Sequence, residues 1–202
     1  MIPAIVLAAG LSSRMGGRPK ALLPLSEGQT FISRIVQAFL DAGVDDVVVV
    51  AGHEADAVAS SLRQGGALAR LVVNDHYRTG QFSSVLCGLD AIDRPGVTAM
   101  LMTLVDVPLV SSSTIRAVVQ RFRETNAPIV RPVRGSEHGH PVLISRPLFD
   151  VLRRADPAKG AKPVVRAHVS LAGDVALDDD GAFRDIDTQA EYARLVAESR
   201  SH

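Results

Sequence analysis

Short apolar runs alternate with segments of helical periodicity along most of the chain. Residues 2–7 and 46–51 are apolar at nearly every position and rich in β-branched side chains, which is typical of strands covered on both faces. Between them, Thr30 precedes apolar residues spaced for one helix face over 31–39, and Gly43 follows. The pattern therefore predicts a strand–helix–strand unit with parallel strands.

The same alternation continues to about residue 131. In chain order it predicts a helix over 54–64, a strand over 70–73, a helix over 83–92, a strand over 98–104, a helix over 113–124 and a strand over 128–131. Strands and helices that alternate at this spacing indicate an α/β protein with a three-layer α/β/α sandwich. In such sheets, ligands bind at the carboxyl ends of the strands.

The rhythm loosens from Pro132 onward. Helices are still predicted over 147–154, 163–168 and 188–199, with loops between them. No stretch has the composition of a linker, so we expect one domain over residues 1–202, with the last third packed on the same sheet.

Composition narrows the classes of function. The 202 residues carry 22 Lys+Arg and 22 Asp+Glu, so nothing in the net charge favours binding to nucleic acid or to an anionic membrane. The single cysteine, Cys87, excludes an internal disulfide framework and a zinc site built on cysteines. The sequence shows neither a basic leader before its first apolar run nor an apolar stretch of membrane-spanning length, so we expect a cytoplasmic protein.

Residues 7–20, "LAAGLSSRMGGRPK", follow the first predicted strand and are rich in alanine and glycine. Small residues let the backbone approach a ligand closely, and backbone N–H groups in such a loop can bind an anion. Arg14, Arg18 and Lys20 add positive charge, so the loop has the properties of a phosphate-binding loop. It matches neither the Walker A pattern nor GxGxxG. A glycine-rich turn with solvated arginines is the alternative on composition alone.

Aspartates follow two apolar segments. Asp106 comes after the strand over 98–104 and before Pro108, where it can bind a divalent cation or cap a turn. Asp185 and Asp187 alternate in a predicted short strand, so their side chains point to opposite faces and only one is expected to meet a metal. The acidic run 178–180 is interpreted as a solvated turn before Gly181.

The segment "LAAGLSSRMGGRPKALLPL", residues 7–25, resembles the signature of the MobA-like nucleotidyltransferases, and its "LAAG" form resembles their molybdenum cofactor cytidylyltransferase branch. Two departures from the family pattern are visible: Gly17 and Arg18 stand where many relatives have one residue, and Val105 stands where glycine is usual. Other segments that match in the family's order are "VVNDHYRTGQFSSVLCGL" (72–89), "LVDVPLV" (104–110), "GHPVLI" (139–144), "ADPAKGAK" (155–162) and "DIDT" (185–188).

The resemblance implies a Rossmann-like, mostly parallel sheet of the nucleotidyltransferase type and a magnesium-dependent transfer of a nucleoside monophosphate to a phosphorylated acceptor. By resemblance, Arg14, Lys20 and Asp106 are catalytic, and Asp106 and Asp187 bind Mg²⁺. The residues that the resemblance assigns to nucleotide binding are Leu7, Ala8, Ala9, Gly10, Arg14, Lys20, Asn74, Ser83 and Ser84.

The acceptor is expected on the side of residues 132–202. His140 and Lys162 are its candidate contacts, and Lys162 stands where relatives often carry arginine. In the cytidylyltransferase branch, CMP passes from CTP to molybdopterin, so the resemblance implies a phosphorylated pterin acceptor and, as a possible partner, a molybdoenzyme under maturation.

Three other functions remain open at the level of sequence. The same mechanism could serve guanylyl transfer, or transfer to a sugar or alditol phosphate. A protein that binds and delivers a cofactor without catalysis is a different class, against which the set Arg14, Lys20, Asp106 and Asp187 argues. A Rossmann-type dehydrogenase is less favoured, because the glycine pattern it needs is missing.

Overall fold

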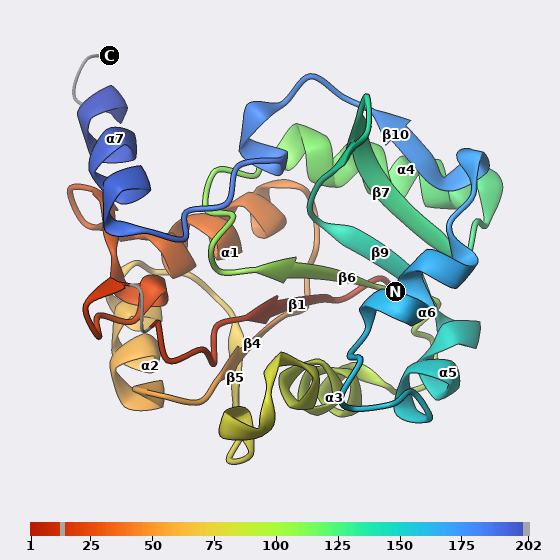
Figure 1. The fold of residues 1–202 in the computed structure, drawn as a ribbon, viewed down its shortest axis with the longest axis horizontal. Helices are drawn as coiled ribbons and strands as arrows, with labels where there is room; N and C mark the ends of the chain where they lie inside the picture. Colours follow the sequence, from red (N-terminus) through yellow and green to blue (C-terminus); the bar gives the residue numbers. More distant parts are fainter. Residues whose placement is uncertain (13–14, 200–202) are drawn as a thin grey trace.

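The computed structural model describes residues 1–12 and 15–199. Within them, one mixed sheet of eight strands forms the centre of the molecule, in the order β10-β7-β9-β6-β1-β4-β5, with β8 paired to β7 (Figure 1). The strands are β1 (Ala4–Leu7), β4 (Val47–Ala51), β5 (Arg70–Val73), β6 (Ala99–Leu104), β7 (Ile129–Arg134), β8 (Glu137–His138), β9 (Val142–Ser145) and β10 (Asp174–Ala176).

Strand β1 lies in the middle of the parallel part of the sheet. It pairs in parallel with β4 on one side and with β6 on the other, and Leu7 is in register with Val50 and Leu104. All four of its residues are buried. Ala4 and Val6 pack on one face of the sheet, and Ile5 and Leu7 on the other. An uninterrupted apolar run is what a strand buried on both faces requires.

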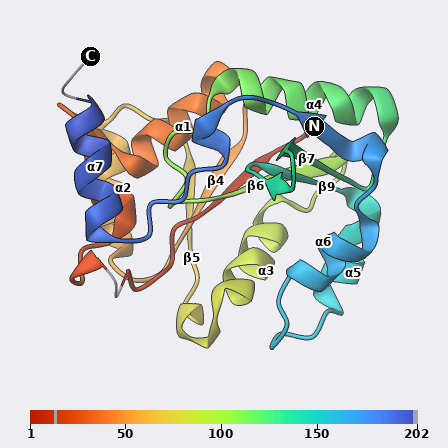
Figure 2. The ribbon, with the colours of Figure 1, turned by 45° about the horizontal axis from the view of Figure 1, so that its top comes forward.

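Helices cover both faces of the sheet. Residues of α1 (Phe31–Asp41), α2 (Ala55–Gln64) and α4 (Ser112–Thr125) pack against one face, and residues of α3 (Gln81–Ile92), α5 (Phe149–Arg153) and α6 (Lys162–His168) against the other. Figure 2 shows α1 and α4 on one side of the sheet and α3, α5 and α6 on the opposite side. The predicted three-layer α/β/α sandwich with a mostly parallel sheet is confirmed.

The ends of these helices follow the predicted caps. Thr30 accepts a hydrogen bond from the backbone N–H of Ser33, whose side chain in turn accepts from the N–H of Thr30, which completes a capping box at α1. Helix α3 begins at Gln81, two residues earlier than predicted, directly after Gly80 at φ 125°. Glycine tolerates this backbone conformation, which other residues rarely adopt.

The last third of the chain joins the same sheet. Strand β9 runs antiparallel to β6 and to β7, while β10 runs parallel to β7 at the edge. The sequence pattern did not predict β8, β9 or β10. The sheet is therefore mixed, and strands from both the first and the last part of the chain build it.

A small hairpin and the final helix form a satellite layer. Strands β2 (Pro24–Ser26) and β3 (Gln29–Thr30) pair with each other, and α7 (Gln189–Ser199) packs beside β2. Both views place α7 on the side where α1 and α2 lie (Figures 1 and 2). A separate apolar cluster joins these segments, made of Met15, Leu23, Phe31, Ile186 and Leu195.

Two interpretations from the sequence were wrong. Residues 184–187 do not form a strand: the backbone N–H of Ile186 donates to the carbonyl of Asp106, a loop residue, so no ladder develops. Within the run 178–180, Asp178 and Asp180 are exposed, but Asp179 is only half-exposed. Its carboxylate accepts hydrogen bonds from Ser111 and Thr114 at the start of α4.

None of the helices in the described part of the chain is both long enough and apolar enough to cross a membrane.

Candidate active site

The candidate site lies where β1 and β6 end. Because these strands are parallel neighbours, Leu7 and Leu104 bring the two following loops side by side, and the backbone N–H of Val105 donates to the carbonyl of Leu7 at 3.1 Å. A cavity of about 300 Å³ opens at this edge. It is lined by Leu7, Ala8, Ala9, Gly10, Ser12, Lys20, Tyr77, Gln81, Ser84, Leu104, Val105, Asp106 and Asp187.

The loop after β1 forms one wall of this cavity. It leads from Leu7 to a short 3-10 helix, Lys20–Leu22, and Gly16 and Gly17 both adopt positive φ within it. The side chain of Ser12 accepts a hydrogen bond from the backbone N–H of Lys20 at 2.9 Å, which fixes the start of the lysine side chain. Arg14, which the family resemblance assigns to catalysis and nucleotide binding, lies outside the described residues.

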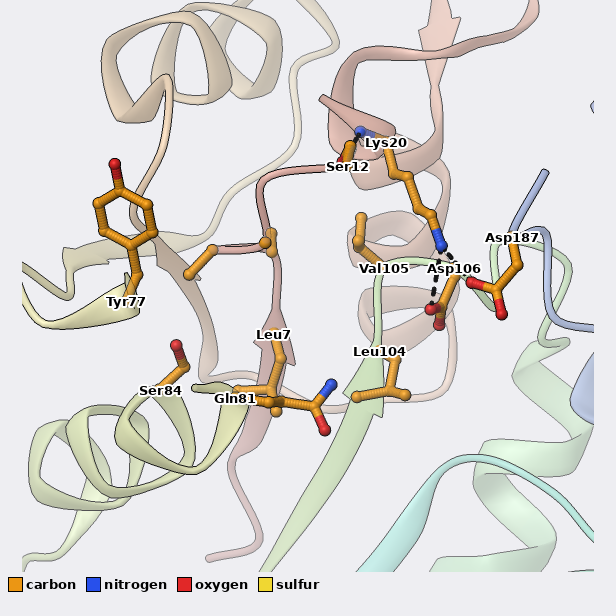
Figure 3. Close-up of a pocket in the computed structure, with 13 residues that line it drawn as sticks. Leu7, Ser12, Lys20, Tyr77, Gln81, Ser84, Leu104, Val105, Asp106 and Asp187 are labelled. Carbon is orange, nitrogen blue, oxygen red and sulfur yellow. Dashed lines mark hydrogen bonds and ion pairs between the residues drawn. The ribbon is translucent and has the colours of Figure 1, made fainter. Parts of the chain in front are cut away.

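The ammonium group of Lys20 lies between two carboxylates from distant parts of the chain (Figure 3). Its Nζ donates to Asp106 Oδ2 at 3.4 Å and forms a closer ion pair with Asp187 Oδ1. The side chains of Lys20 and Asp106 are 12% and 20% exposed, and that of Asp187 is 41% exposed. Burial limits solvent screening, so this cluster is a strongly charged part of the cavity wall.

The position of Asp187 depends on its neighbours in sequence. Ile186 is fully buried in the satellite cluster, and its backbone N–H donates to the carbonyl of Asp106 at 2.8 Å. The carboxylate of Glu191 accepts hydrogen bonds from the backbone N–H groups of Asp187 and Thr188, both at 2.8 Å. The first turn of α7 therefore holds Asp187 against the loop after β6.

Asp106 and Asp187 offer oxygen ligands of the kind that divalent cations prefer. Asp106 Oδ1 is buried and accepts no hydrogen bond from any described residue, so one ligand atom is available. Among the described residues, no group of three or more His, Cys, Asp or Glu side chains is placed to hold a metal ion. Two carboxylate groups completed by phosphate oxygens and water match the oxygen-rich, water-retaining coordination of Mg²⁺.

A second cavity, of about 630 Å³, adjoins the first. The two share Leu7, Gln81 and Leu104 as lining residues. Its apolar lining side chains include Phe82, Val85, Met102, Val142 and Val165. Its titratable lining side chains are all basic, namely Arg131, His138, His140, Lys159, Lys162 and Arg166. This cavity therefore suits an anionic molecule with an apolar body.

His140 and Lys162, the two candidate acceptor contacts, both line this second cavity. His140 is half-buried, with Nδ1 3.4 Å from the carbonyl oxygen of Met102. Burial lowers the pKa of His140, although this hydrogen bond and the nearby Asp106 and Asp185 act in the opposite direction. At pH 7 the imidazole is therefore neutral and acts as a hydrogen-bonding group. Lys162 is exposed at the first position of α6.

A family model described as the MobA-like NTP transferase domain matches residues 4–172. The chain belongs to this family. It is 30% identical over 201 residues to the nicotine blue oxidoreductase of Paenarthrobacter nicotinovorans, with 96% of each chain covered. It also aligns with the bifunctional protein GlmU of Sinorhizobium fredii, at 25% identity over 195 residues, but spans only 42% of that protein's length.

Solved structures show the same relationship. Rv0371c from Mycobacterium tuberculosis H37Rv superposes with a TM-score of 0.80 at 29% identity, with 97% of each chain covered, and a second structure of that protein is a complex with manganese. A nucleotidyl transfer enzyme from Methanothermobacter superposes with a TM-score of 0.80 at 29% identity, with 100% of this chain and 99% of that chain covered. The predicted membership of the MobA-like family is thus confirmed.

In this MobA-like protein, the polar residues before and within α3 hold the start of that helix in position. The amide nitrogen of Asn74 donates to the hydroxyl groups of Ser83 and Ser84, both at 2.9 Å, and its oxygen accepts from the backbone N–H of His76 at 3.0 Å. Of the three predicted nucleotide-binding residues here, Ser84 lines the first cavity, while Asn74 and Ser83 do not. Asn74 is buried and fixes the start of α3 beside the cavity.

Asp185 is exposed, yet its carboxylate lies near enough to Asp106, Asp187 and Lys20 to interact with them electrostatically. Burial raises the pKa of Asp185, and the nearby Asp106 raises it further, while His140 and Lys20 act in the opposite direction. Since residues 184–187 form no strand, the alternation argument that separated Asp185 from Asp187 does not apply. The MobA-like site therefore has a third carboxylate nearby, although Asp185 lines neither of the two cavities.

Sequence reasoning missed three polar residues of the first cavity: Ser12, Tyr77 and Gln81. Ser12 lies inside the quoted glycine-rich loop, and its φ of 49° is unusual for serine. Tyr77 packs so closely on Gly52 that a Cβ at that glycine would lie 2.6 Å from its ring. The only feature of the sequence that could have indicated this contact is Gly52, directly after β4.

Proposed function

We propose that this MobA-like protein transfers a nucleoside monophosphate, CMP from CTP being favoured, to a phosphorylated acceptor and releases pyrophosphate. The observation that supports the proposal is the convergence of Lys20, Asp106 and Asp187 in a cavity at the strand ends. Beside it lies a second cavity with basic side chains. Two anionic reactants therefore have adjoining places on one molecule.

The main obstacle in this reaction is the repulsion between two polyanions and the charge that accumulates as the α-phosphorus is attacked. Positioning and electrostatic stabilisation supply most of the acceleration in phosphoryl and nucleotidyl transfer. Lys20 contacts the α-phosphate and Arg14 the departing β- and γ-phosphates in this proposal. Asp106 and Asp187 hold Mg²⁺, which neutralises phosphate charge when it is bound.

No general base is needed, because an acceptor phosphate is already ionised near pH 7. The neutral imidazole of His140 orients the acceptor by a hydrogen bond, and Lys162 supplies positive charge. The phosphate oxygen of the acceptor forms the new bond to the α-phosphorus, and the bond to the pyrophosphate oxygen breaks. Pyrophosphate leaves with the electron pair of that bond.

The nucleoside lies over the small residues at the end of β1 in this proposal. Ala8, Ala9 and Gly10 line the first cavity with Leu7, so their main-chain groups can reach the edge of the base. Ser84 borders the same cavity from the first turns of α3, while Asn74 and Ser83 hold that helix start in place. Main-chain reading of the base explains why side chains this small suffice here.

The acceptor we favour is a phosphorylated pterin of the molybdopterin type. The apolar floor and basic side chains of the second cavity fit a flat ring system that carries anionic groups. A molybdoenzyme under maturation would then receive the product in the cytoplasm. Guanylyl transfer, or transfer to a sugar or alditol phosphate, uses the same groups and differs only in the two substrates.

A second candidate function comes from the relative in Paenarthrobacter nicotinovorans, which is named an oxidoreductase and aligns over 96% of this chain. An oxidoreductase of this fold would bind a reduced nucleotide cofactor in the first cavity and its organic substrate in the second. The cluster of Lys20 with two aspartates favours a triphosphate and a metal instead. Consumption of NADH or NADPH with a dye substrate, without pyrophosphate release, would establish this alternative.

The test is a pyrophosphate-release assay with CTP, GTP, ATP and UTP, each with Mg²⁺ and with a molybdopterin acceptor. We expect turnover to be fastest with CTP and to vanish when EDTA removes the metal. Preferential use of GTP would contradict the choice of nucleotide and leave the mechanism intact. Tight binding of the acceptor with no pyrophosphate release from any of the four nucleotides would instead support the delivery function.

A further inference from the structure

Lys20 is held by the same two carboxylates that we propose as metal ligands. Its ammonium group contacts Asp106 Oδ2 at 3.4 Å and Asp187 Oδ1 more closely, in a part-buried position (Figure 3). We infer that Lys20 is an exchangeable counter-cation of the metal site. Without nucleotide its ammonium competes with a divalent cation for the two aspartates, and a bound triphosphate draws it away. This inference rests on the proposed function and adds an order of events to it.

The competition follows from charge and from the contacts. The ammonium of Lys20 pairs with the carboxylates of both Asp106 and Asp187, the groups that a divalent cation would need. Mg²⁺ binds carboxylate oxygens at about 2.0–2.1 Å, so an ion on these two groups would lie close to the ammonium nitrogen. Repulsion between the two cations is weakly screened where side chains are only 12% and 20% exposed. The ammonium therefore lowers the affinity of the nucleotide-free protein for metal.

The site retains one atom ready for a metal while Lys20 is in place. Asp106 Oδ1 is buried and accepts no hydrogen bond from the described residues, while Oδ2 is occupied by Lys20. A buried carboxylate oxygen without a partner is energetically unfavourable. The state with Lys20 bound is thus incompletely satisfied, and a divalent cation that replaces the ammonium would engage the remaining oxygen.

Lys20 can leave the aspartates without movement of the backbone. Its backbone N–H is fixed by Ser12 Oγ, and its side chain, which has four rotatable bonds, borders the cavity that also contains Gly10. When a triphosphate binds in this cavity, its oxygens can accept hydrogen bonds from the ammonium while the metal binds the two aspartates. Metal and nucleotide therefore raise each other's affinity, as reciprocal coupling between two sites requires.

The test measures Mn²⁺ binding by electron paramagnetic resonance in protein without nucleotide. Lys20→Met keeps an unbranched side chain of nearly the same length and removes its charge. We therefore expect Mn²⁺ to bind about 5- to 150-fold more tightly than in the unchanged protein, the usual range of coupling. The matched control is Arg18→Met, which removes one charge from an exposed position of the same loop and should have a much smaller effect. Equal or weaker binding by Lys20→Met overturns the inference.

The relative Mn²⁺ affinities of the two proteins should reverse when an α,β-methylene analogue of CTP, which cannot react, is present. There the unchanged protein should hold Mn²⁺ and the analogue more tightly than Lys20→Met does, because the ammonium now contacts phosphate. Tighter binding by the variant in both conditions would mean that Lys20 only opposes the metal and never moves to the nucleotide, which overturns the exchange.

A second measurement needs no variant. The chain has three lysines, Lys20, Lys159 and Lys162, so protein with ¹³C-labelled lysine gives few side-chain signals. We expect Mg²⁺ alone to shift the Cε signal of Lys20 and to leave that of Lys159 unchanged. A Lys20 signal that stays in place while Mn²⁺ binding is measurable overturns the inference. Neither experiment depends on turnover, so a failure of nucleotidyl transfer and a failure of the exchange are seen separately.

Discussion

At the scale of single residues, Lys20 and Asp106 carry the proposed chemistry. We expect Lys20→Ala and Asp106→Ala each to lower the rate of pyrophosphate release by at least about 100-fold, as the loss of one electrostatic contact to a transition state commonly does. Both side chains lie beyond strand ends, outside the apolar clusters, so the variants should still fold. Circular dichroism checks the fold, and steady-state assays measure the rate.

Asp45→Ala is a control for these variants, because it removes an exposed carboxylate just before β4, at the opposite edge of the sheet. Its rate should stay close to that of the unchanged protein. If Lys20→Ala or Asp106→Ala also kept a near-normal rate, the role assigned to that residue would be wrong.

That Lys20 and Asp106 would lie near strand ends was predictable because each belongs to a contiguous motif. Lys20 follows a glycine-rich loop, and Asp106 follows an apolar run, so sequence neighbours alone suggest a strand end. Ser12 and Tyr77 were not predictable in the same way. Their position in the cavity depends on a local positive φ and on a close contact with Gly52, neither of which leaves a periodic pattern.

At the scale of elements, Asp179 holds the start of α4. Its carboxylate accepts from Ser111 Oγ at 2.6 Å and from Thr114 Oγ1 at 2.5 Å, while Ser111 caps the helix. Burial alone would raise the pKa of Asp179, but these hydrogen bonds outweigh burial and hold the pKa below its ordinary value. Because hydrogen bonds to a charged group are strong, we expect Asp179→Ala to lower the free energy of unfolding by about 2 kcal/mol at pH 7.

The pH dependence of this loss has a definite sign. A carboxylate whose pKa is lowered by folding stabilises the protein at pH values above the pKa that the group has in the unfolded chain, about 3.9. This contribution disappears as the pH falls through the pKa of the folded state. The difference between the unchanged protein and Asp179→Ala in urea denaturation should therefore shrink below about pH 4. Asp178→Ala, at an exposed position, should show neither the loss nor the pH dependence.

The helices and parallel strands were predictable at this scale, and the antiparallel additions were not. Strand β4 and the cap of α1 at Thr30 lie where local periodicity and capping residues placed them. Strand β9 pairs with β7, a near neighbour along the chain, and also with β6, which is distant in sequence, so residues 142–145 alone do not indicate its place in the sheet. The strand predicted around Asp185 and Asp187 was wrong because the partner of Ile186 is a loop rather than a strand.

At the scale of the whole molecule, the site joins the two ends of the described chain. The loop after β1 contributes Lys20, and the segment before α7 contributes Asp187, 167 positions later. The matched family model ends at residue 172, so Asp187 lies beyond the matched range. Apolar contacts of Met15 and Leu23 with Ile186 and Leu195 hold the same two segments together behind the ion cluster. The packing of α7 is thus a condition for the geometry of the site.

A ligand that binds this site should therefore stabilise the entire fold. Magnesium and CTP present at about 100 times their dissociation constant add about 2.7 kcal/mol to the free energy of unfolding, which is about 5–10 °C in the melting temperature for a chain of this size. In Asp187→Ala the shift should fall to a small fraction of this value, because one of the two carboxylates that would hold the metal is removed. Asp45→Ala should keep the full shift. Differential scanning fluorimetry measures both variants with and without Mg²⁺ and CTP, and an equal shift in Asp187→Ala would show that the C-terminal segment takes no part in binding.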